Sequence, residues 1–229
     1  MEVADFKDKH RGERCFVLGC GPSLSKINLD LIANEVSFAM NNICLIYPQT
    51  KWRPTYYWSS TQSLNKYPKW LEWGKEAISY GQPSFIGNES PIPDAPNTIR
   101  LNIFSVRKPA RDTWALPAAI WTTDAAKQIY HYRMSAYGLM QLVQYMGCNP
   151  VYMLGFDNNW IAGGPNHFSP DYEAGFEWNE EYVAHETFWQ GYAHKKIKMY
   201  MDHLGIDVYD CTVGGSLEVY PRVNLEDIL

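Results

Sequence analysis

Short apolar segments alternate along the chain with longer segments of helical periodicity, and this alternation limits the possible folds more than any other feature. Seven segments have the length and the β-branched and aromatic content of strands: 14–18, 36–40, 55–59, 83–86, 98–101, 151–155 and 206–211. They are apolar along their whole length, which is typical of strands buried on both faces. The sequence therefore predicts an α/β fold of the Rossmann-like type, with a mostly parallel sheet covered by helices on both faces.

The segments between these strands include three with the spacing of amphipathic helices: 64–80, 135–147 and 180–204. In the last of them one apolar stripe repeats at intervals of four and three residues, and it comprises Trp189, Ala193, Ile197, Tyr200 and Leu204. We expect this stripe to pack against the sheet and Gly205 to end the helix. In the second helix, Ser135 is a plausible N-cap and Gly147 ends the periodicity.

The chain shows no internal repeat and no linker that separates two parts of different amino-acid composition. Its 229 residues, 46% of them hydrophobic, suffice for one sizeable core, so residues 1–229 are predicted to form a single domain. Two stretches read as insertions after strands, at 102–133 and 156–179. Loops of this length in a compact domain are usually functional, and both are interpreted as lids.

Composition and charge exclude several classes of protein. The longest apolar run, 114–121, has eight residues and contains Pro117, whereas a membrane-spanning helix needs about 20. Residues 1–14 are rich in charge and lack an apolar stretch, so no secretory signal and a cytoplasmic location are expected. The net charge of −5, with dispersed basic residues, argues against nucleic-acid binding. We expect a small-molecule partner; the oligomeric state is left open.

The cysteines and the aromatic residues have mostly structural interpretations. The cysteines are odd in number and form no C-x-x-C pair, so buried free thiols are expected at Cys15, Cys20, Cys44, Cys148 and Cys211. The 9 Trp, 16 Tyr and 9 Phe residues are many for this length. Most are expected in the core, although some have the chemistry of surfaces that stack on sugars or bases.

The first predicted strand runs into a turn with two glycines, Gly19-Cys20-Gly21-Pro22-Ser23. The glycines let the backbone approach a ligand closely, and the serine hydroxyl with nearby amides is suited to a phosphate or a ribose. The third glycine of the dinucleotide-binding fingerprint and the lysine of a P-loop are both missing. A purely structural tight turn is the alternative interpretation.

Two asparagines, Asn41 and Asn42, follow the second predicted strand. Their side-chain amides can make paired hydrogen bonds to a base edge or a ribose, and they come where a nucleotide would cross the strand ends of a parallel sheet. The alternative is that they cap a loop, a common role of asparagine.

The strand at 151–155 is followed by Asp157, and His167 lies in a loop flanked by Gly and Pro residues. An imidazole can act as a general base near neutral pH, and Asp157 or Asp171 is placed in sequence to orient it. The alternative is a solvated or hydrogen-bonded loop histidine. His185, His194 and His203 lie within the predicted helix at 180–204 without metal-pair spacing, so surface or packing roles are expected.

Four landmarks in the chain resemble, in order, those of a bacterial family. They are R-C-F-V-L-G-C-G-P-S-L at 14–24, F-A-M-N at 38–41, G-C-N-P-V-Y-M-L-G-F-D at 147–157 and N-H-F at 166–168. The family is the MptE-like (6-hydroxymethylpterin diphosphokinase-like) family of surface-glycan loci, which also supplies the core of the motility accessory factor flagellin glycosyltransferases. The same landmarks are similar to those of the bacterial lipooligosaccharide sialyltransferases, which use a CMP-sugar, one Rossmann-like domain and no essential metal.

The resemblance implies a role for individual residues. The glycine turn would wrap the ribose and phosphate, and Ser135 would approach the donor at a helix N-terminus that favours negative charge. The implied nucleotide-binding residues are Gly19, Cys20, Gly21, Pro22, Ser23, Asn41, Asn42, Ser60, Ser135, Tyr137, Gly155 and Asp157. Tyrosines near the helix start, Tyr130, Tyr132 and Tyr137, would stabilise the leaving phosphate, and His167 would be the base, with Asp157 as the second catalytic residue.

The chain also departs from the sialyltransferase pattern. Cys20 replaces an asparagine of the glycine turn, Ala136 replaces a glycine after the matching serine, and Asp171 stands near the position of a second lid histidine. These changes leave the donor nucleotide and sugar open.

The resemblance implies a sialyltransferase-like glycosyltransferase that transfers a sugar from a nucleotide donor, a CMP-sugar first of all, to a glycan hydroxyl. No cofactor and no metal site are expected, and the chain has no D-x-D pair. One alternative is an ATP-dependent pterin diphosphokinase, with Mg²⁺ held by carboxylates such as Asp157. The other is a non-catalytic nucleotide-binding module.

Overall fold

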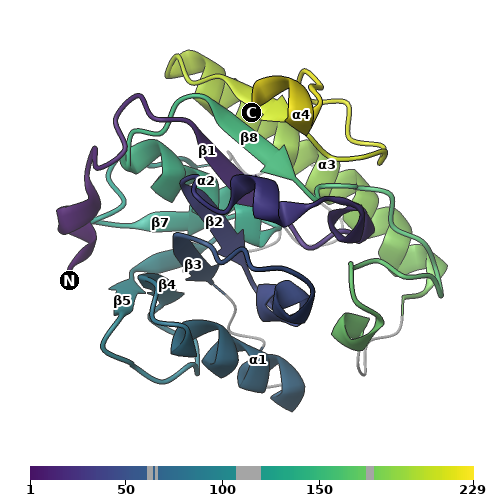
Figure 1. Cartoon of the computed structure of the whole chain (residues 1–229), viewed down its shortest axis with the longest axis horizontal. Helices are drawn as coiled ribbons and strands as arrows, with labels where there is room; N and C mark the ends of the chain where they lie inside the picture. The colour runs from purple at the N-terminus through teal and green to yellow at the C-terminus, as the bar shows by residue number, and fades with distance from the viewer. Residues whose placement is uncertain (61–63, 65–66, 107–119, 174–177) are drawn as a thin grey trace.

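A computed structural model describes residues 1–60, 64, 67–106, 120–173 and 178–229. In this part of the chain one sheet has seven strands, all parallel: β1 (Cys15–Leu18), β2 (Ser37–Met40), β3 (Tyr56–Ser59), β4 (Ser84–Gly87), β5 (Thr98–Leu101), β8 (Val151–Leu154) and β9 (Val208–Asp210). Each coincides with one of the predicted strands to within two residues at either end. The predicted parallel sheet is therefore confirmed (Figure 1).

The strand order is β5-β4-β3-β2-β1-β8-β9, so the chain starts in the middle of the sheet and builds outward in two directions. The direction reverses between β1 and β8, which pair with Cys15 opposite Val151 and Leu18 opposite Leu154. Parallel sheets bind ligands at such a switch point, beyond the carboxyl ends of the strands. The fold thus brings the ends of β1, β2 and β8 to one crevice.

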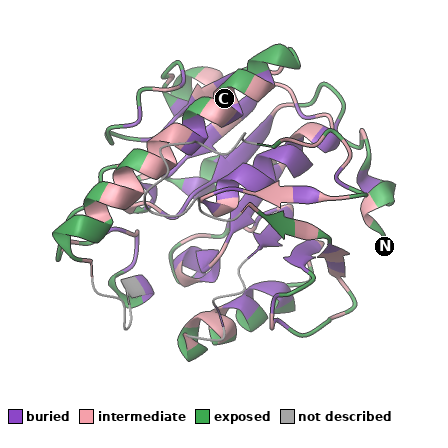
Figure 2. Ribbon diagram, turned by 180° about the vertical axis from the view of Figure 1, so that it is seen from behind, coloured by how far each residue is buried: buried purple, intermediate pink, exposed green. Residues whose placement is uncertain are grey.

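The predicted helices are present as α1 (Pro68–Ser79), α2 (Ser135–Tyr145) and α3 (Glu180–His203), and a short α4 (Leu225–Ile228) was not predicted. Because right-handed crossovers running in opposite directions lie on opposite faces, α2 and α3 cover the face seen in Figure 2, and α1 lies on the other. On that other face the connections also include short 3₁₀ turns, among them Pro22–Lys26, Leu29–Ile32 and Ile43–Gln49.

The apolar stripe predicted for α3 is correct only in part. Ala193 and Ile197 are buried, but Leu204 is 38% exposed, and Met201 takes its place in the core. The first half of α3 is mostly half-buried or exposed, as the green and pink turns in Figure 2 show. Gly205 has a φ of +71° directly after the helix, so its predicted role in ending α3 is confirmed.

The N-cap of α2 differs from the expectation. Met134 is the N-cap and Ser135 is the first helical residue, so the Ser135 hydroxyl does not cap the helix. It donates instead to Oδ1 of Asn41, 3.2 Å away. Gly147, with a φ of +82°, follows the end of α2 as predicted.

The first expected insertion contains structure that periodicity did not reveal. Its ends form a small parallel pair, β6 (Ile103–Ser105) and β7 (Ile129–His131), while residues 107–119 lie outside the described chain. The buried side chain of Gln141 in α2 accepts from the backbone N–H of Tyr130 and donates to its carbonyl oxygen. This amide fixes β7 against α2 and sets where the chain enters the helix.

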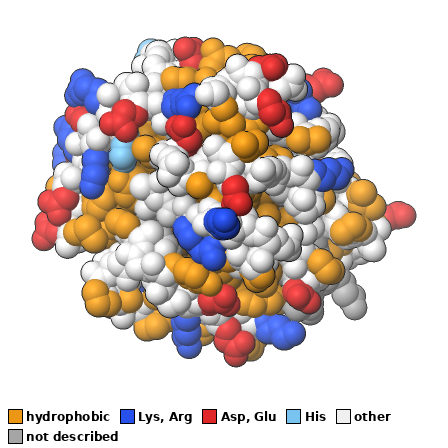
Figure 3. All heavy atoms as spheres, in the orientation of Figure 1, with side chains coloured by type: hydrophobic (Ala, Val, Ile, Leu, Met, Phe, Trp, Pro, Cys, Tyr) orange, Lys and Arg blue, Asp and Glu red, His pale blue; other side chains and the backbone are white. Residues whose placement is uncertain are grey.

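The five cysteines are buried free thiols, as predicted. Among the described residues, no helix has the length and apolar character needed to cross a membrane. On the face drawn in Figure 3, lysine and arginine side chains are interspersed with aspartate and glutamate and do not gather into a basic stripe.

Candidate functional site

A cavity of about 340 Å³ opens at the carboxyl ends of β1, β2 and β8, next to the start of α2. Many of the residues selected from the sequence line it: Gly19, Cys20, Gly21, Pro22, Asn41, Asn42, Ser135, Gly155, Asp157 and His167. Strands of a parallel sheet end on one side, so residues far apart in the sequence converge here. The cavity is the candidate site of the molecule.

Strained backbone is concentrated at this cavity. In the described chain four residues other than glycine have a positive φ, and three of them line the cavity: Asn41 at 56°, Arg133 at 64° and Asn158 at 49°. Each follows the end of a strand. Such conformations cost free energy, and they cluster at functional sites because the surrounding structure holds them in place.

The glycine turn is held by the protein's own hydrogen bonds. The N–H of Gly19 donates to the carbonyl of Leu154 at 2.8 Å, and that of Gly21 donates to the carbonyl of Gly155 at 2.9 Å. A Cβ at Gly21 would overlap the Asp157 carboxylate and the Gly155 carbonyl. The glycines are therefore required by close packing between the ends of β1 and β8, and these two amides face away from a ligand.

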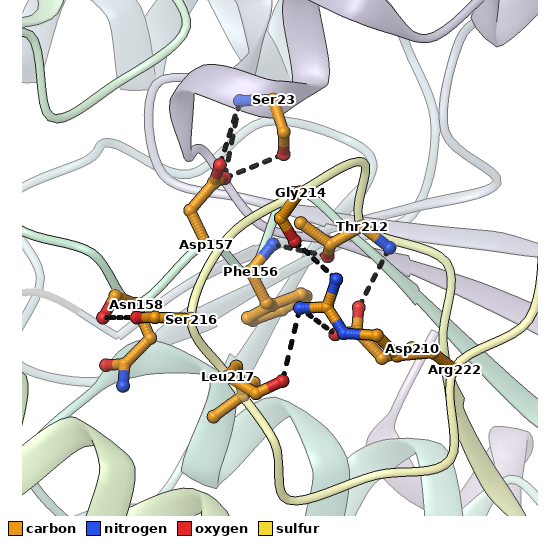
Figure 4. Close-up of polar contacts among 10 residues, drawn as sticks. All are labelled: Ser23, Phe156, Asp157, Asn158, Asp210, Thr212, Gly214, Ser216, Leu217 and Arg222. Carbon is orange, nitrogen blue, oxygen red and sulfur yellow. Dashed lines mark hydrogen bonds and ion pairs between the residues drawn. The ribbon is translucent and has the colours of Figure 1, made fainter.

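Ser23 belongs to the same packing. It is 1% exposed, its N–H lies 3.2 Å from Oδ1 of Asp157, and its Oγ donates to Oδ2 at 2.7 Å. Figure 4 shows the carboxylate of Asp157 pointing at Ser23. The structure places Ser23 behind the cavity wall, where its hydroxyl serves Asp157, instead of in the expected position facing a phosphate.

A second polar network holds the residue before Asp157 (Figure 4). The N–H of the neighbouring Phe156 donates to Oγ1 of Thr212 at 3.0 Å, and the N–H of Thr212 donates to Oδ1 of Asp210 at 2.8 Å. Burial raises the pKa of Asp210, and Arg222 lies 3.4 Å from its other oxygen. These contacts fix the segment after β8, and with it the cavity wall.

The two asparagines after β2 face the cavity. Asn41 accepts from the Ser135 hydroxyl, and its carbonyl accepts from the Tyr57 hydroxyl at 2.8 Å, so its strained backbone is held from both sides. Asn42 is almost fully buried, and its Nδ2 has no hydrogen-bond partner among the described residues. A buried, unpaired amide donor is costly unless a ligand oxygen pairs with it.

Arg133 is a site residue that the sequence interpretation missed. Among the described residues that line the cavity, it is the only arginine or lysine. Its guanidinium packs over the Trp189 ring at 3.9 Å, and Nη1 is buried without a hydrogen-bond partner in the described chain. Its place two residues before the predicted helix could have revealed it, because a cation beside a helix N-terminus forms an anion site.

Two histidines of the cavity lining are neutral at physiological pH. Burial lowers the pKa of His131 to about 4 and that of His194 to about 3. His194 contacts the Tyr220 hydroxyl at 3.1 Å and packs edge-on against Phe156, which fits the expected packing role. The positive charge at this end of the cavity therefore comes from Arg133 and the helix N-terminus.

His167 lines the cavity and stacks on an aromatic ring. Its ring stacks face to face on Tyr172, with centroids 3.7 Å apart and planes at 5°. The Asp157 carboxylate accepts hydrogen bonds from the N–H and the hydroxyl of Ser23, and Asp171 is exposed. Stacking on Tyr172 helps to orient the imidazole.

Besides Ser23, four expected site residues do not line the cavity. Tyr137 is buried and donates to the carbonyl of Ile120, Tyr132 is packed against Tyr137, and Tyr130 in β7 packs edge-on against Phe104. Burial raises the pKa of Tyr132 and Tyr137. Ser60 is buried beside the cavity, and its neighbour Ser59 lines it instead.

No group of three or more His, Cys, Asp or Glu side chains in the described residues is arranged to hold a metal ion.

The comparisons with known proteins concern the fold. The structure is similar to that of a MAf glycosyltransferase from Magnetospirillum magneticum AMB-1, with a TM-score of 0.58 and 12% sequence identity. The match covers 96% of this chain and 37% of that protein, so the chain spans just over a third of its length. No family model matches the sequence, and no curated protein matches it. The Rossmann-like fold is thus shared with a glycosyltransferase.

Proposed function

We propose that the chain is a glycosyltransferase that takes a sugar from a nucleotide donor, a CMP-sugar, and transfers it to a glycan hydroxyl. The observation that carries the proposal is the anion site formed by Arg133 and the N-terminus of α2 in the cavity at the switch point of the sheet. A buried guanidinium nitrogen without a partner and the first N–H groups of a helix both favour a phosphate. The fold shared with a glycosyltransferase supports the same reaction class.

The neighbouring asparagines would hold the nucleoside. The unpaired Nδ2 of Asn42 is a donor, and the cytosine ring offers two acceptors, O2 and N3. Asn41 and Ser135, already hydrogen-bonded to each other, offer their remaining capacity to the ribose between base and phosphate. The donor would lie across the ends of β1 and β2, with its phosphate at α2.

The transfer itself requires one proton acceptor and a stabilised leaving group. The acceptor hydroxyl oxygen would attack the anomeric carbon, its proton would pass to His167, and the bond from that carbon to the phosphate oxygen would break. CMP would leave with the bonding electrons, and Arg133 would balance the charge that develops on its phosphate. His167 and the α2 terminus line the same cavity, as this reaction needs.

Calorimetric titration tests the proposal and separates the alternatives. We expect CMP to bind without Mg²⁺, and binding to weaken at least tenfold in Arg133→Met while Lys127→Met, which changes an exposed lysine outside the cavity, leaves it unchanged. Binding of ATP that depends on Mg²⁺ would favour the pterin diphosphokinase. Binding of CMP with no donor hydrolysis and no transfer to any acceptor in a broad panel would favour the non-catalytic module.

A further inference from the structure

A series of aromatic rings leads from the glycine turn to the outside of the molecule. The loop that carries it is attached to the turn, because the N–H of Phe168 donates to the carbonyl of Cys20 at 3.1 Å. Tyr172 lies innermost at 4% exposed, and His167 stacks on it. Tyr182, in the first turn of α3, is 37% exposed and forms the outer end.

Two tryptophans connect these ends. The rings of Trp160 and Trp178 are stacked with centroids 4.7 Å apart, and Tyr182 meets Trp178 edge-on at 5.5 Å. The His167 ring lies 5.7 Å from Trp160 and 5.8 Å from Trp178. All four residues line the cavity. The candidate base therefore stands between the glycine turn and a half-buried aromatic cluster.

We infer that Trp160, Trp178 and Tyr182 form the subsite for the acceptor sugar, and that its ligand is the apolar face of a neutral pyranose ring. This inference rests on the proposed function, since it names the acceptor side of that same site. Ring faces offer broad apolar contact to the C–H groups of a pyranose at low cost in side-chain entropy. A sugar lying there would present its outer hydroxyls to His167.

The location of the polar groups favours the acceptor over the donor at this cluster. The phosphate and nucleoside contacts, Arg133, Asn41 and Asn42, come from the ends of β7 and β2, whereas the aromatic cluster comes from the loop after β8 and the start of α3. Trp160 also has a buried indole Nε1 without a partner in the described chain. A bound sugar oxygen would accept a hydrogen bond from this N–H. That hydrogen bond would lower the free-energy cost of burying the indole nitrogen.

Saturation-transfer NMR with simple sugars tests the inference. The probes are methyl β-D-galactopyranoside and methyl β-D-glucopyranoside, each with and without saturating CMP. The control probe is mannitol, an acyclic polyol that is rich in hydroxyls but has no ring face. We expect saturation to be transferred from the protein to the ring C–H protons of at least one pyranoside, and we expect no transfer to mannitol. In Trp178→Ala the apparent affinity should fall at least tenfold, while Trp178→Phe should keep it within about threefold because it retains a ring face.

A matched control and a second titration separate the possible outcomes. Phe188→Ala removes an exposed aromatic ring of α3 that lies outside the cavity, and it should leave the pyranoside signal unchanged. Intact CMP binding in Trp178→Ala would show that the variant is folded. Absence of any pyranoside signal in the wild type, or a signal that survives in Trp160→Ala and Trp178→Ala alike, would overturn the inference. If the wild type does not bind CMP, the proposed function is overturned. The pyranoside result would then still report whether the aromatic cluster binds a sugar.

Discussion

The Oγ of Ser23 donates a hydrogen bond of 2.7 Å to Oδ2 of Asp157 and so ties the turn after β1 to the end of β8, the strand next to it in the sheet. The Ser23 N–H points at the same carboxylate. Because this carboxylate is buried, it depends on hydrogen-bond donors from the protein, and Ser23 supplies two of them. The pair closes the back wall of the cavity and leaves its front to Asn41, Asn42 and Arg133.

Removing the serine hydroxyl should destabilise the fold. Ser23→Ala leaves a buried carboxylate short of one donor, and hydrogen bonds to charged groups contribute about 1.5–3 kcal/mol. We expect the free energy of unfolding in urea to fall by that amount. Ser25→Ala is the matched control, since its exposed hydroxyl bonds only to the carbonyl of Pro22, and it should change stability by less than about 1 kcal/mol. Equal effects in both variants would contradict the role given to Ser23.

Two glycine substitutions should act in opposite directions. A methyl group at Gly21 would meet the Asp157 carboxylate and the Gly155 carbonyl, so Gly21→Ala should destabilise the protein by more than about 2 kcal/mol. At Gly191, within α3, the nearest atom is 3.4 Å from the added Cβ, and alanine should stabilise the helix by up to about 1 kcal/mol. Thermal melting of both variants checks this. A tolerated Gly21→Ala would mean that the turn is looser than described.

The buried His194 should make stability depend on pH. Its pKa is lowered to about 3 in the folded protein by burial, whereas the unfolded chain has the ordinary value of about 6.5. Between these values the unfolded state binds more protons, so the free energy of unfolding should rise as pH increases from about 4 to 6.5 and be lost on acidification. His194→Gln should make this part of the profile shallower and leave the contribution of His131, and the exposed His203→Gln should not change it. Identical profiles for His194→Gln and the wild type would contradict the assignment.

Replacing the candidate base should separate chemistry from binding. In His167→Gln we expect kcat for sugar transfer to fall about 10²–10⁴-fold, because the imidazole that takes the proton of the acceptor hydroxyl is removed. The affinity for CMP should stay within about threefold, since the phosphate and nucleoside contacts lie at Arg133 and the asparagines. An unchanged kcat would remove His167 from the mechanism.

Much of the fold could be predicted because the strands are buried on both faces. In a segment such as Cys15–Leu18 all four residues are buried and none is polar, so the sequence identifies it as a buried strand. The pair β6 and β7 could not be found this way, because each has three residues and β7 is held by the side chain of Gln141, a contact between distant segments. Leu204 was misassigned because it lies one residue beyond the end of α3 and is exposed, whereas Met201, four residues after Ile197, is the last buried residue of the helix.

The site was predictable in its location but not in its inner contacts. Residues after parallel strands must converge on one edge, which is why Asn41 and Asp157 line the same cavity. Sequence order does not say which of them pairs with which, so Ser23 was expected to face a phosphate although it faces Asp157. Arg133 was hidden among the residues of an apparent loop, and only the packing of α2 brings it to the cavity.

The most direct test of the account is a crystal structure of the protein with bound CMP. We expect the phosphate to lie within hydrogen-bond distance of the Arg133 guanidinium and of the first backbone N–H groups of α2, with the cytosine edge near Asn42. A CMP molecule whose phosphate lies on the glycine turn, or one bound outside this cavity, would contradict the central claim.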